Sequence, residues 1–449
     1  MSPKGRDVAP GRLSRRHLLA GAGAVTAGTV AGCFGGTDSS DTDDVEDITF
    51  LHFETDDERR AAIESLGEAF AAEEGIELTQ AVEPEADLPT RIQADVAAGT
   101  LPNVAALNHS TLHAAADAVA SESAERVIER IGEDRFYDSL LDLVRGPDGN
   151  YRGVPLYTWP QLTIYRQELF EERGLPEPRT WEDLLEAASA LHDPDDDQFG
   201  IILGTAPDQY TLQCFSGVAL SNNARVFDDD GEIVFDSDEM IEALEFYAEL
   251  AQYTPPGEID AGSIGPAYDN QQAHLYSGNS FSLYFNALGL EEGETMPDGV
   301  VPSVTNERSS TFGEVVSTAT FAGQSAAEIE AAERWQSFVR GADDESRYVE
   351  WCHIQPGGFQ PVLEAVPEMD AYRENEIIQR WDDELVETTL PESIRQSERF
   401  GFRDGESFPA IGQITGNFLI AGAVSDVVDG ENAREIAEET ADEMRDLIE

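Results

Sequence analysis

The hydrophobic pattern from residue 48 onward alternates between short apolar runs and longer segments with helical spacing. The run ITFLHF, at 48–53, is short and apolar, which predicts a buried strand. The segment 57–72 carries Ile63, Leu66 and Phe70 at the three- and four-residue spacing of one helix face. The pattern therefore begins with a strand followed by a helix.

The same alternation continues further along the chain. The run IELTQAV, at 76–82, alternates like a strand, and residues 88–98 return to a helical pattern. A second apolar run, NVAAL at 103–107, predicts another buried strand. The order strand, helix, strand, helix, strand predicts an open α/β sheet.

Candidate binding residues follow the ends of two of these strands. Phe53 and Glu54 come after the first strand, and Asn108 and His109 come after the third. Ligands of open α/β sheets bind at the carboxyl ends of the strands. We therefore expect these four side chains at the rim of a binding site.

The rest of the chain holds an aromatic-rich segment at 151–166 and several helical patterns. The helical patterns are 181–191, 238–253, 326–340 and 433–448. The residues DDDG, at 228–231, stand between apolar runs and predict a hairpin turn. The sequence contains no P-loop, no HExxH, no GxSxG and no GxGxxG after a strand. It therefore offers no catalytic or nucleotide-binding motif.

The length and composition of the chain indicate the number of its lobes and its charge. A chain of 449 residues exceeds what one hydrophobic core usually fills, so we expect two lobes. The net charge is −62, from 28 basic and 90 acidic residues, and Lys4 is the only lysine. So acidic a protein repels phosphate backbones, which argues against a nucleic-acid partner.

The acidic residues recur along the whole chain, and this distribution has two explanations. They form either the solvated faces of ordinary helices or the surface of a protein that stays hydrated in very high salt, where self-repulsion is screened. We favour the second explanation, because the near-absence of lysine resembles haloarchaeal proteins.

The first 47 residues are typical of an export signal and a tether. Arg15 and Arg16 precede an uncharged run of small residues, which favours export by the twin-arginine (Tat) route. The run TVAGC ends at Cys33 and resembles the lipidation site of a lipoprotein. We expect a signal at 1–32 and an acidic disordered tether at 33–47; the alternative is a short N-terminal helix with an incidental cysteine.

Two cysteines remain, Cys214 and Cys352, which is too few for a disulfide framework. We expect two separate buried thiols, with a single bridge as the alternative. Trp335, Trp351 and Trp381 lie in helical patterns and are expected in the core.

A resemblance to a known family rests on an ordered set of motifs. The segment 154–191, VPLYTWPQLTIYRQELFEERGLPEPRTWEDLLEAASAL, contains Tyr-x-x-x-Leu-Phe and then Gly-Leu-x-x-Pro-x-Thr-Trp-x-Asp-Leu. Further motifs are LPNV at 101–104, a helix ending in Pro-Pro at 240–256, a helix and strand at 268–288, a helix at 321–339, and GGFQPV at 357–362. Together they resemble extracellular solute-binding proteins of family 1, the maltose-type sugar receptors of ABC importers. The usual Gly-Lys-x-Ala-Met is absent at 268–288.

The resemblance implies a two-lobed α/β fold of the type II periplasmic-binding-protein kind, with a ligand cleft between lobes joined by hinge strands. Lobe one is expected to comprise 48–153 and 315–350, and lobe two 154–314 and 351–449, with the C-terminal helices packing near the hinge. It also implies a monomeric, non-enzymatic receptor without cofactor or metal. Its partners would be a sugar and the permease subunits in the membrane, outside the cell.

A sugar site needs aromatic platforms and planar hydrogen-bonding side chains. Trp159 follows the expected crossing between lobes, and Tyr157 lies on the same face of that strand. With the resemblance added, the expected ligand-binding residues are Phe53, Glu54, Asn108, His109, Tyr157, Trp159, Gln213, Tyr284, Asn286, Gly358 and Phe359.

Three alternatives stay open at this point. The same fold serves non-sugar solutes, such as a polyamine, glycerol phosphate or a metal complex. A secreted, anchored glycoside hydrolase with paired carboxylates is the enzymatic alternative. An adhesive surface protein would usually show repeats, and none is visible. Two weaker patterns, a calcium-like loop at 193–200 and an N-x-S glycan acceptor at Asn108, are not expected to function.

Overall fold

The computed structural model describes residue 45 and residues 47–291, 293–403 and 405–448. The predicted signal at 1–32, the lipidation site at Cys33 and nearly all of the tether lie outside the described residues. None of the described helices is long and apolar enough to cross a membrane.

A mixed sheet organises the described chain, with strands in the order β2-β1-β3-β8-β4-β5. Its strands are β1 (Asp47–His52), β2 (Glu77–Val82), β3 (Val104–Leu107), β4 (Val154–Arg166), β5 (Leu275–Asn279), β6 (Asp298–Val301), β7 (Val304–Thr305), β8 (Ser309–Thr320) and β9 (Ser397–Glu398). The strands β10 (Phe402–Arg403) and β11 (Glu406–Ser407) form a separate hairpin. The sheet is parallel among β1, β2 and β3 and antiparallel from β3 through β8 and β4 to β5.

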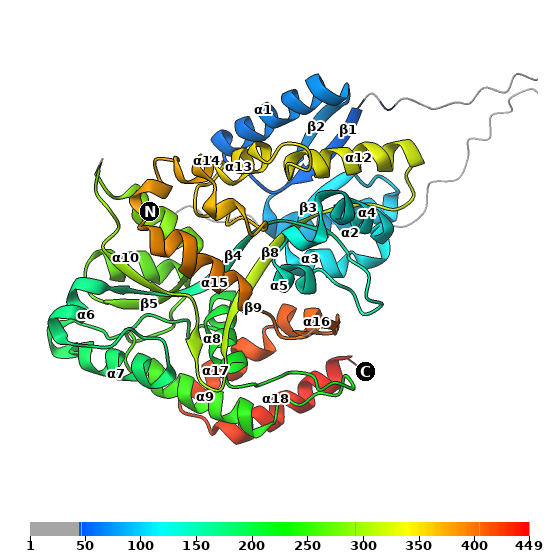
Figure 1. Ribbon diagram of the computed structural model, residues 1–449. Coiled ribbons are helices and arrows are strands. Elements are labelled where there is room, and N and C mark those ends of the chain that lie inside the picture. Colours follow the sequence, from blue (N-terminus) through cyan, green and yellow to red (C-terminus); the bar gives the residue numbers. More distant parts are fainter. Residues whose placement is uncertain (1–44, 46, 292, 404, 449) are drawn as a thin grey trace, which may run out of the picture. The chain divides into compact units, whose positions relative to one another are not determined.

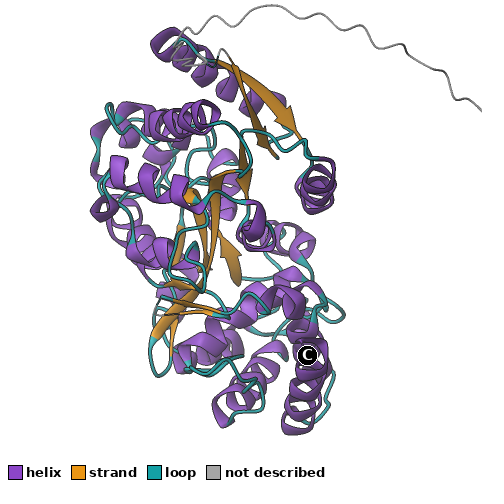
Figure 2. Ribbon diagram, turned by 90° about the vertical axis from the view of Figure 1, so that its right-hand side faces the viewer, coloured by secondary structure: helices purple, strands orange, loops and turns teal. Residues whose placement is uncertain are grey.

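Helices lie on both sides of these strands (Figure 2). They are α1 (Asp57–Glu74), α2 (Leu88–Ala98), α3 (His109–Ala114), α4 (Ser121–Ile131), α5 (Asp138–Leu143), α6 (Gln167–Arg173), α7 (Trp181–Leu191), α8 (Gln209–Ser221), α9 (Asp238–Ala251), α10 (Ile264–Asp269), α11 (Ser280–Leu288), α12 (Ala326–Val339), α13 (Ser346–Cys352), α14 (Asp370–Arg373), α15 (Leu390–Arg395), α16 (Ile411–Gly416), α17 (Leu419–Val428) and α18 (Ala433–Ile448). Every strand and helix predicted from periodicity is present, and the bounds differ by no more than two residues.

The long strand β4 belongs to two parts of the sheet. Its first half, Val154–Pro160, pairs with β8, and its second half, Gln161–Tyr165, pairs with β5. Figure 1 shows β4 and β8 running side by side between the region of β3 and the region of α8. A strand shared in this way is the crossing element that the sequence motifs implied. The residue boundaries of the two lobes, given above from the sequence, stay a prediction.

Buried Arg340 fixes the start of β4. Its guanidinium donates to the carbonyl oxygens of Val154 (2.7 Å) and Pro155 (2.6 Å) and to Thr318 Oγ1 (2.7 Å). The side chain is fully buried, and desolvation lowers its pKa to about 9. The end of α12 is thereby tied to the first residues of the crossing strand.

Thr180 and Asp183 form a reciprocal capping box at the start of α7. Several local predictions are confirmed. The residues 228–231 form a turn in which Asp228 accepts two backbone N–H groups, from Asp230 and Glu232. Trp335, Trp351 and Trp381 are buried, and Cys214 and Cys352 are buried free thiols, so the alternative of a bridge is excluded.

Candidate functional site

One face of β4 presents Tyr157 and Trp159, because alternate residues of a strand point the same way. Glu314 of β8 lies directly opposite Trp159 in the register, and Phe312 follows on the same face. The half-buried Trp159 ring has its centroid 6.0 Å from that of Phe312 and 6.4 Å from that of Phe281. The indole is therefore an aromatic platform held between two phenyl rings.

Tyr157 connects this face to the end of β1. Its hydroxyl donates to Glu54 Oε1 at 3.0 Å, and Arg59 donates to Glu54 Oε2 at 2.8 Å. Burial and the neighbouring Glu54 raise the pKa of Tyr157 well above its ordinary value, so the hydroxyl stays protonated and donates. Phe53, half-buried, precedes Glu54 at the strand end, as the sequence predicted.

The turn at Gly358 and Phe359 closes onto the same strand. The Phe359 ring stacks on Tyr157 with centroids 3.9 Å apart, and Gln360 exchanges two backbone hydrogen bonds with Thr158, each 3.0 Å. A Cβ at Gly358 would stand 2.9 Å from the Phe281 ring and 2.7 Å from the side chain of Gln355. Only glycine fits at this close approach.

Asn108 is the N-cap residue of α3, and His109 is the first residue of that helix. Both contribute to the same site from the α3 end of β3. Asn108 Oδ1 accepts from the Thr111 N–H at 3.0 Å, and its Nδ2 donates to Glu85 at 2.9 Å. The backbone N–H of His109 donates to Glu314 Oε1 at 2.8 Å. The amide nitrogen of Asn108, the atom that a glycan would modify, is engaged inside the site.

Three carboxylates converge here, and we call the region the carboxylate compartment (Glu54, Glu85, Asn108, Tyr157, Trp159 and Glu314). Glu54 is paired with Arg59, and Glu314 with Arg399 at 2.5 Å. Glu85 has the neutral Asn108 as its hydrogen-bond partner. Desolvation and the nearby carboxylates of Glu314 and Glu54 raise the pKa of Glu85, even though this residue is partly open to solvent. Because two of the three carboxylates are balanced by guanidinium groups, the compartment carries little net charge.

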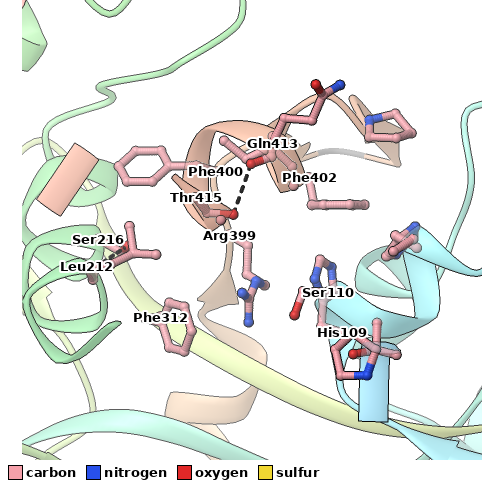
Figure 3. Close-up of a pocket in the computed structure, with 18 of the residues that line it drawn as sticks. His109, Ser110, Leu212, Ser216, Phe312, Arg399, Phe400, Phe402, Gln413 and Thr415 are labelled. Carbon is pink, nitrogen blue, oxygen red and sulfur yellow. Dashed lines mark hydrogen bonds between the residues drawn. The ribbon is translucent and has the colours of Figure 1, made fainter. Parts of the chain in front are cut away.

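A cavity of about 530 Å³ adjoins this compartment, and we call it the α16 cavity. Its walls come from α2, α3, α8, β8, α16 and the segment 399–402 (Figure 3). Phe312 is shared, since it contacts Trp159 and also lines the cavity, where Arg399 lies over its ring at 4.5 Å. The volume falls within the range of about 300–1,000 Å³ typical of small-molecule sites.

Two histidines form one wall of the α16 cavity. Burial lowers the pKa of His109 well below its ordinary value and that of His113 to about 4, so both rings are neutral near pH 7. His113 Nε2 is 2.9 Å from the carbonyl oxygen of Leu143. His109 is 3% exposed, and its Nε2 has no hydrogen-bond partner among the described residues.

Three predicted site residues are not brought into the compartment. Asn286 of α11 donates to the hydroxyl of Tyr276 and to Asp298, each at 3.2 Å. Tyr284 contacts the exposed Phe285, with centroids 5.4 Å apart. Gln213 lies on α8 between the cavity-lining Leu212 and Ser216 but does not itself line the cavity.

Sequence reasoning missed Glu85, Phe312, Glu314, Arg399 and Phe402. One signal was available, because Glu314 is the one charged residue in the otherwise uncharged stretch that forms β8. Arg399 and Phe402 lie in the segment SERFGFRDGE, which has no periodicity that marks them. In the described parts of the chain, no three His, Cys, Asp or Glu side chains are grouped to hold a metal ion.

Comparison with known proteins identifies relatives of this chain. A family model described as bacterial extracellular solute-binding protein matches residues 55–286. The putative ABC transporter periplasmic-binding protein YcjN of Escherichia coli (strain K12) is 32% identical over 388 residues, which cover 85% of this chain and 88% of that protein. A mannitol-binding protein of Pseudomonas aeruginosa is 32% identical over 161 residues, or 34% of this chain and 36% of that protein.

The fold is shared with solved structures of the same kind. The structure of maltose-bound MalE3 of T. maritima superposes with a TM-score of 0.69 at 18% identity, over 89% of this chain and 99% of that one. The predicted two-lobed α/β fold of the periplasmic-binding-protein type is thereby confirmed. The chain belongs to the bacterial extracellular solute-binding protein family.

Proposed function

We propose that the protein is the sugar receptor of an ABC importer, which captures a neutral sugar or small oligosaccharide outside the cell and delivers it to a membrane permease. The observation that carries the proposal is the aromatic platform of Trp159 beside three converging carboxylates. An indole face covers the apolar side of a sugar ring, and carboxylate and amide oxygens accept its hydroxyl protons. The names of relatives that bind mannitol and maltose support this assignment.

The charge balance of the compartment favours a neutral ligand over the charged alternatives. A phosphate ester would need free guanidinium groups, whereas Arg59 and Arg399 are already paired with Glu54 and Glu314. A polyamine would need several unpaired carboxylates, whereas Glu85 is the one acidic group of the compartment without a cationic partner.

The same residues favour binding of a ligand over catalysis of its hydrolysis. Glu54 and Glu314 are each fixed by an arginine and a further hydrogen bond, which suits positioning of hydroxyl groups. A glycoside hydrolase would need one carboxylic acid with a raised pKa and a second carboxylate free to attack or to activate water. Glu85 has a raised pKa, but the two carboxylates beside it, Glu54 and Glu314, are both paired with arginine. We propose that lobe closure on the ligand, rather than turnover, is the functional event.

The location and the working conditions complete the proposal. Tat export, lipidation at Cys33 and a tether at 33–47 would hold the receptor, as a monomer, next to its permease on the outer face of the membrane. The net charge of −62 suits a protein that folds and works in multi-molar salt, where self-repulsion is screened.

Thermal unfolding in multi-molar salt tests the proposal, using neutral sugars and polyols, spermidine and glycerol phosphate as separate arms. A ligand present at 100 times its dissociation constant adds about 2.7 kcal/mol to the unfolding free energy, which raises Tm by several degrees. The expected result is a rise with a neutral sugar, with no product formed from it on prolonged incubation. A rise with only spermidine or glycerol phosphate, or release of a hydrolysed sugar, would contradict the proposal.

A further inference from the structure

The crossing strand β4 contains one residue more than its pairing with β8 uses. Pro155 pairs with Ser317. The next pair is Tyr157 with Val316, so Leu156 is an extra residue in the register. An extra residue in one strand of an antiparallel pair is a β-bulge, and bulges occur next to binding sites because they change where a side chain points.

The bulge determines which side chain of β4 lies beside Glu314. With the extra residue present, Trp159 is opposite Glu314. If β4 continued the pairing of Pro155 with Ser317, Thr158 would take that place, because antiparallel strands run in opposite order. Trp159 would then lie on the other face of the sheet from Glu314, since successive side chains of a strand alternate. The aromatic platform and its carboxylate therefore share a face because of the bulge.

Two buried side chains hold the main chain of β4 at the bulge. Arg340 donates to the carbonyl oxygens of Val154 (2.7 Å) and Pro155 (2.6 Å). The hydroxyl of Tyr348 donates to the carbonyl oxygen of Leu156 at 2.7 Å. Both side chains are fully buried. Three successive carbonyl groups, up to and including that of the extra residue, are thus bonded to side chains from α13 and the end of α12.

The charge of Arg340 is more than a space-filling residue would need. Its other described hydrogen bonds go to the carbonyl oxygen of Gln336 (2.9 Å) and to Thr318 Oγ1 (2.7 Å), so all its described acceptors are neutral. A buried charge is costly unless its donors are satisfied. A guanidinium offers five donors in a fixed fork, which is more than any neutral side chain offers. This arrangement suits a residue that must hold consecutive carbonyl groups in place.

Tyr348 also connects the bulge to the turn that closes onto the site. Its hydroxyl accepts from the N–H of Val362 at 2.8 Å. Val362 comes three residues after Phe359, whose ring stacks on Tyr157. One hydroxyl group therefore fixes the bulge of β4 relative to the turn at 358–362.

We propose that Arg340 and Tyr348 are positioning residues of the ligand site, which hold the bulge at Leu156 and thereby place the Trp159 indole on the same face as Glu314. Both are buried behind the strand and act through β4 rather than by contact with the ligand. This inference rests on the proposed function, since it concerns the same binding site.

The key variant is Tyr348→Phe, which removes the hydroxyl and keeps the ring. Tyr247→Phe is the matched control, because Tyr247 is also fully buried and its hydroxyl donates to the carbonyl oxygen of Gly204 at 2.7 Å, outside the bulge and the turn. Arg340→Lys is the second variant; it keeps the charge and loses the planar fork.

Three measurements on the full chain in multi-molar salt compare these variants. Thermal unfolding gives their stability, and calorimetric titration with glucose, maltose and mannitol gives their affinity. Acrylamide quenching of fluorescence without sugar, with Trp159→Phe as the background, reports whether the Trp159 indole has moved. The quenching detects a change in position that a general loss of stability would not produce.

Both tyrosine variants should lower Tm, since each leaves a buried carbonyl group without its donor. Tyr348→Phe and Arg340→Lys should also weaken sugar binding by about 10-fold and change the quenching of Trp159, whereas Tyr247→Phe should change neither. Unchanged affinity in both Tyr348→Phe and Arg340→Lys, or an equal loss in Tyr247→Phe, would overturn the inference. If the wild type binds none of the three sugars, the proposed function is contradicted, and the quenching of Trp159 in Tyr348→Phe then decides the inference by itself.

Discussion

The carboxylate compartment and the α16 cavity lie side by side but are built in opposite ways. The compartment is polar, with each carboxylate held by a named donor around one aromatic platform. The cavity is lined by phenylalanine rings interspersed with histidine, serine, threonine and glutamine side chains, and it has volume rather than an ordered set of acceptors. The difference suggests that the compartment, with its fixed acceptors, determines which chemical class binds, whereas the cavity beside it offers space without such an ordered set.

The largest expected effect concerns the ion pair that the two regions share. Arg399→Met should lower the unfolding free energy by about 3–5 kcal/mol, because it leaves the carboxylate of Glu314 buried without a cation. Denaturant unfolding at fixed salt measures this loss. The double variant Arg399→Met with Glu314→Gln should recover much of it. If the single variant proves as stable as Arg60→Met, which removes an exposed pair, the buried ion pair does not hold the two regions together.

Acid should destabilise the cavity wall through His113. The pKa of His113 is lowered to about 4 in the folded protein, so the unfolded chain takes up the proton first. The contribution of His113 is intact above about pH 6.5 and is lost as the pH falls toward 4, by at most about 3 kcal/mol. His113→Gln, which keeps a donor for the Leu143 carbonyl, should flatten the pH dependence of stability over that window. An unchanged pH dependence would show that this histidine is not buried in its neutral form.

Removal of the aromatic platform separates binding from folding. Trp159→Ala should weaken sugar binding by about 2 kcal/mol, or roughly 30-fold, since it removes the surface on which the sugar ring packs. Calorimetry measures this change against Phe285→Ala, which removes an exposed aromatic ring of α11 that contacts neither region. Equal affinities in the two variants would place the ligand elsewhere.

The smallest effect is expected at Glu85. Glu85→Gln keeps a hydrogen-bond acceptor and removes the one carboxylate charge of the compartment that lacks a cation, so affinity for a neutral sugar should change by about 1 kcal/mol or less. A titration with the best-binding sugar checks this, with Glu85→Ala as the variant that also removes the acceptor. A much larger loss in Glu85→Gln would indicate a cationic ligand.

The compartment apart from Glu85 and Glu314 could be predicted from the sequence, because its other residues follow local signals. Phe53, Glu54, Asn108 and His109 come after apolar runs, and strand ends meet at one edge of a sheet. Tyr157 and Trp159 share a face by simple alternation. These short-range rules brought together the part of the site that depends on the strands.

The cavity could not be predicted, because its walls depend on tertiary placement. Arg399 reaches Glu314 across 85 positions of the chain, and Phe402 reaches His109 only after the C-terminal segment folds back over α3. Asn286, for which the resemblance implied a ligand contact, donates its amide to Tyr276 and Asp298, outside the compartment. Position in a motif does not specify where a side chain points.

Tryptophan fluorescence tests the central claim, that the ligand lies on Trp159, most directly. The other four tryptophans are buried, with exposed fractions of 8% or less, so Trp159 is the indole that a ligand would cover. Titration with the sugar that gives the largest rise in Tm should change the emission and reach saturation. Trp159→Phe should lose this signal, while calorimetry still detects binding. Sugar binding that leaves the wild-type emission unchanged, or a signal that persists in Trp159→Phe, would contradict the account.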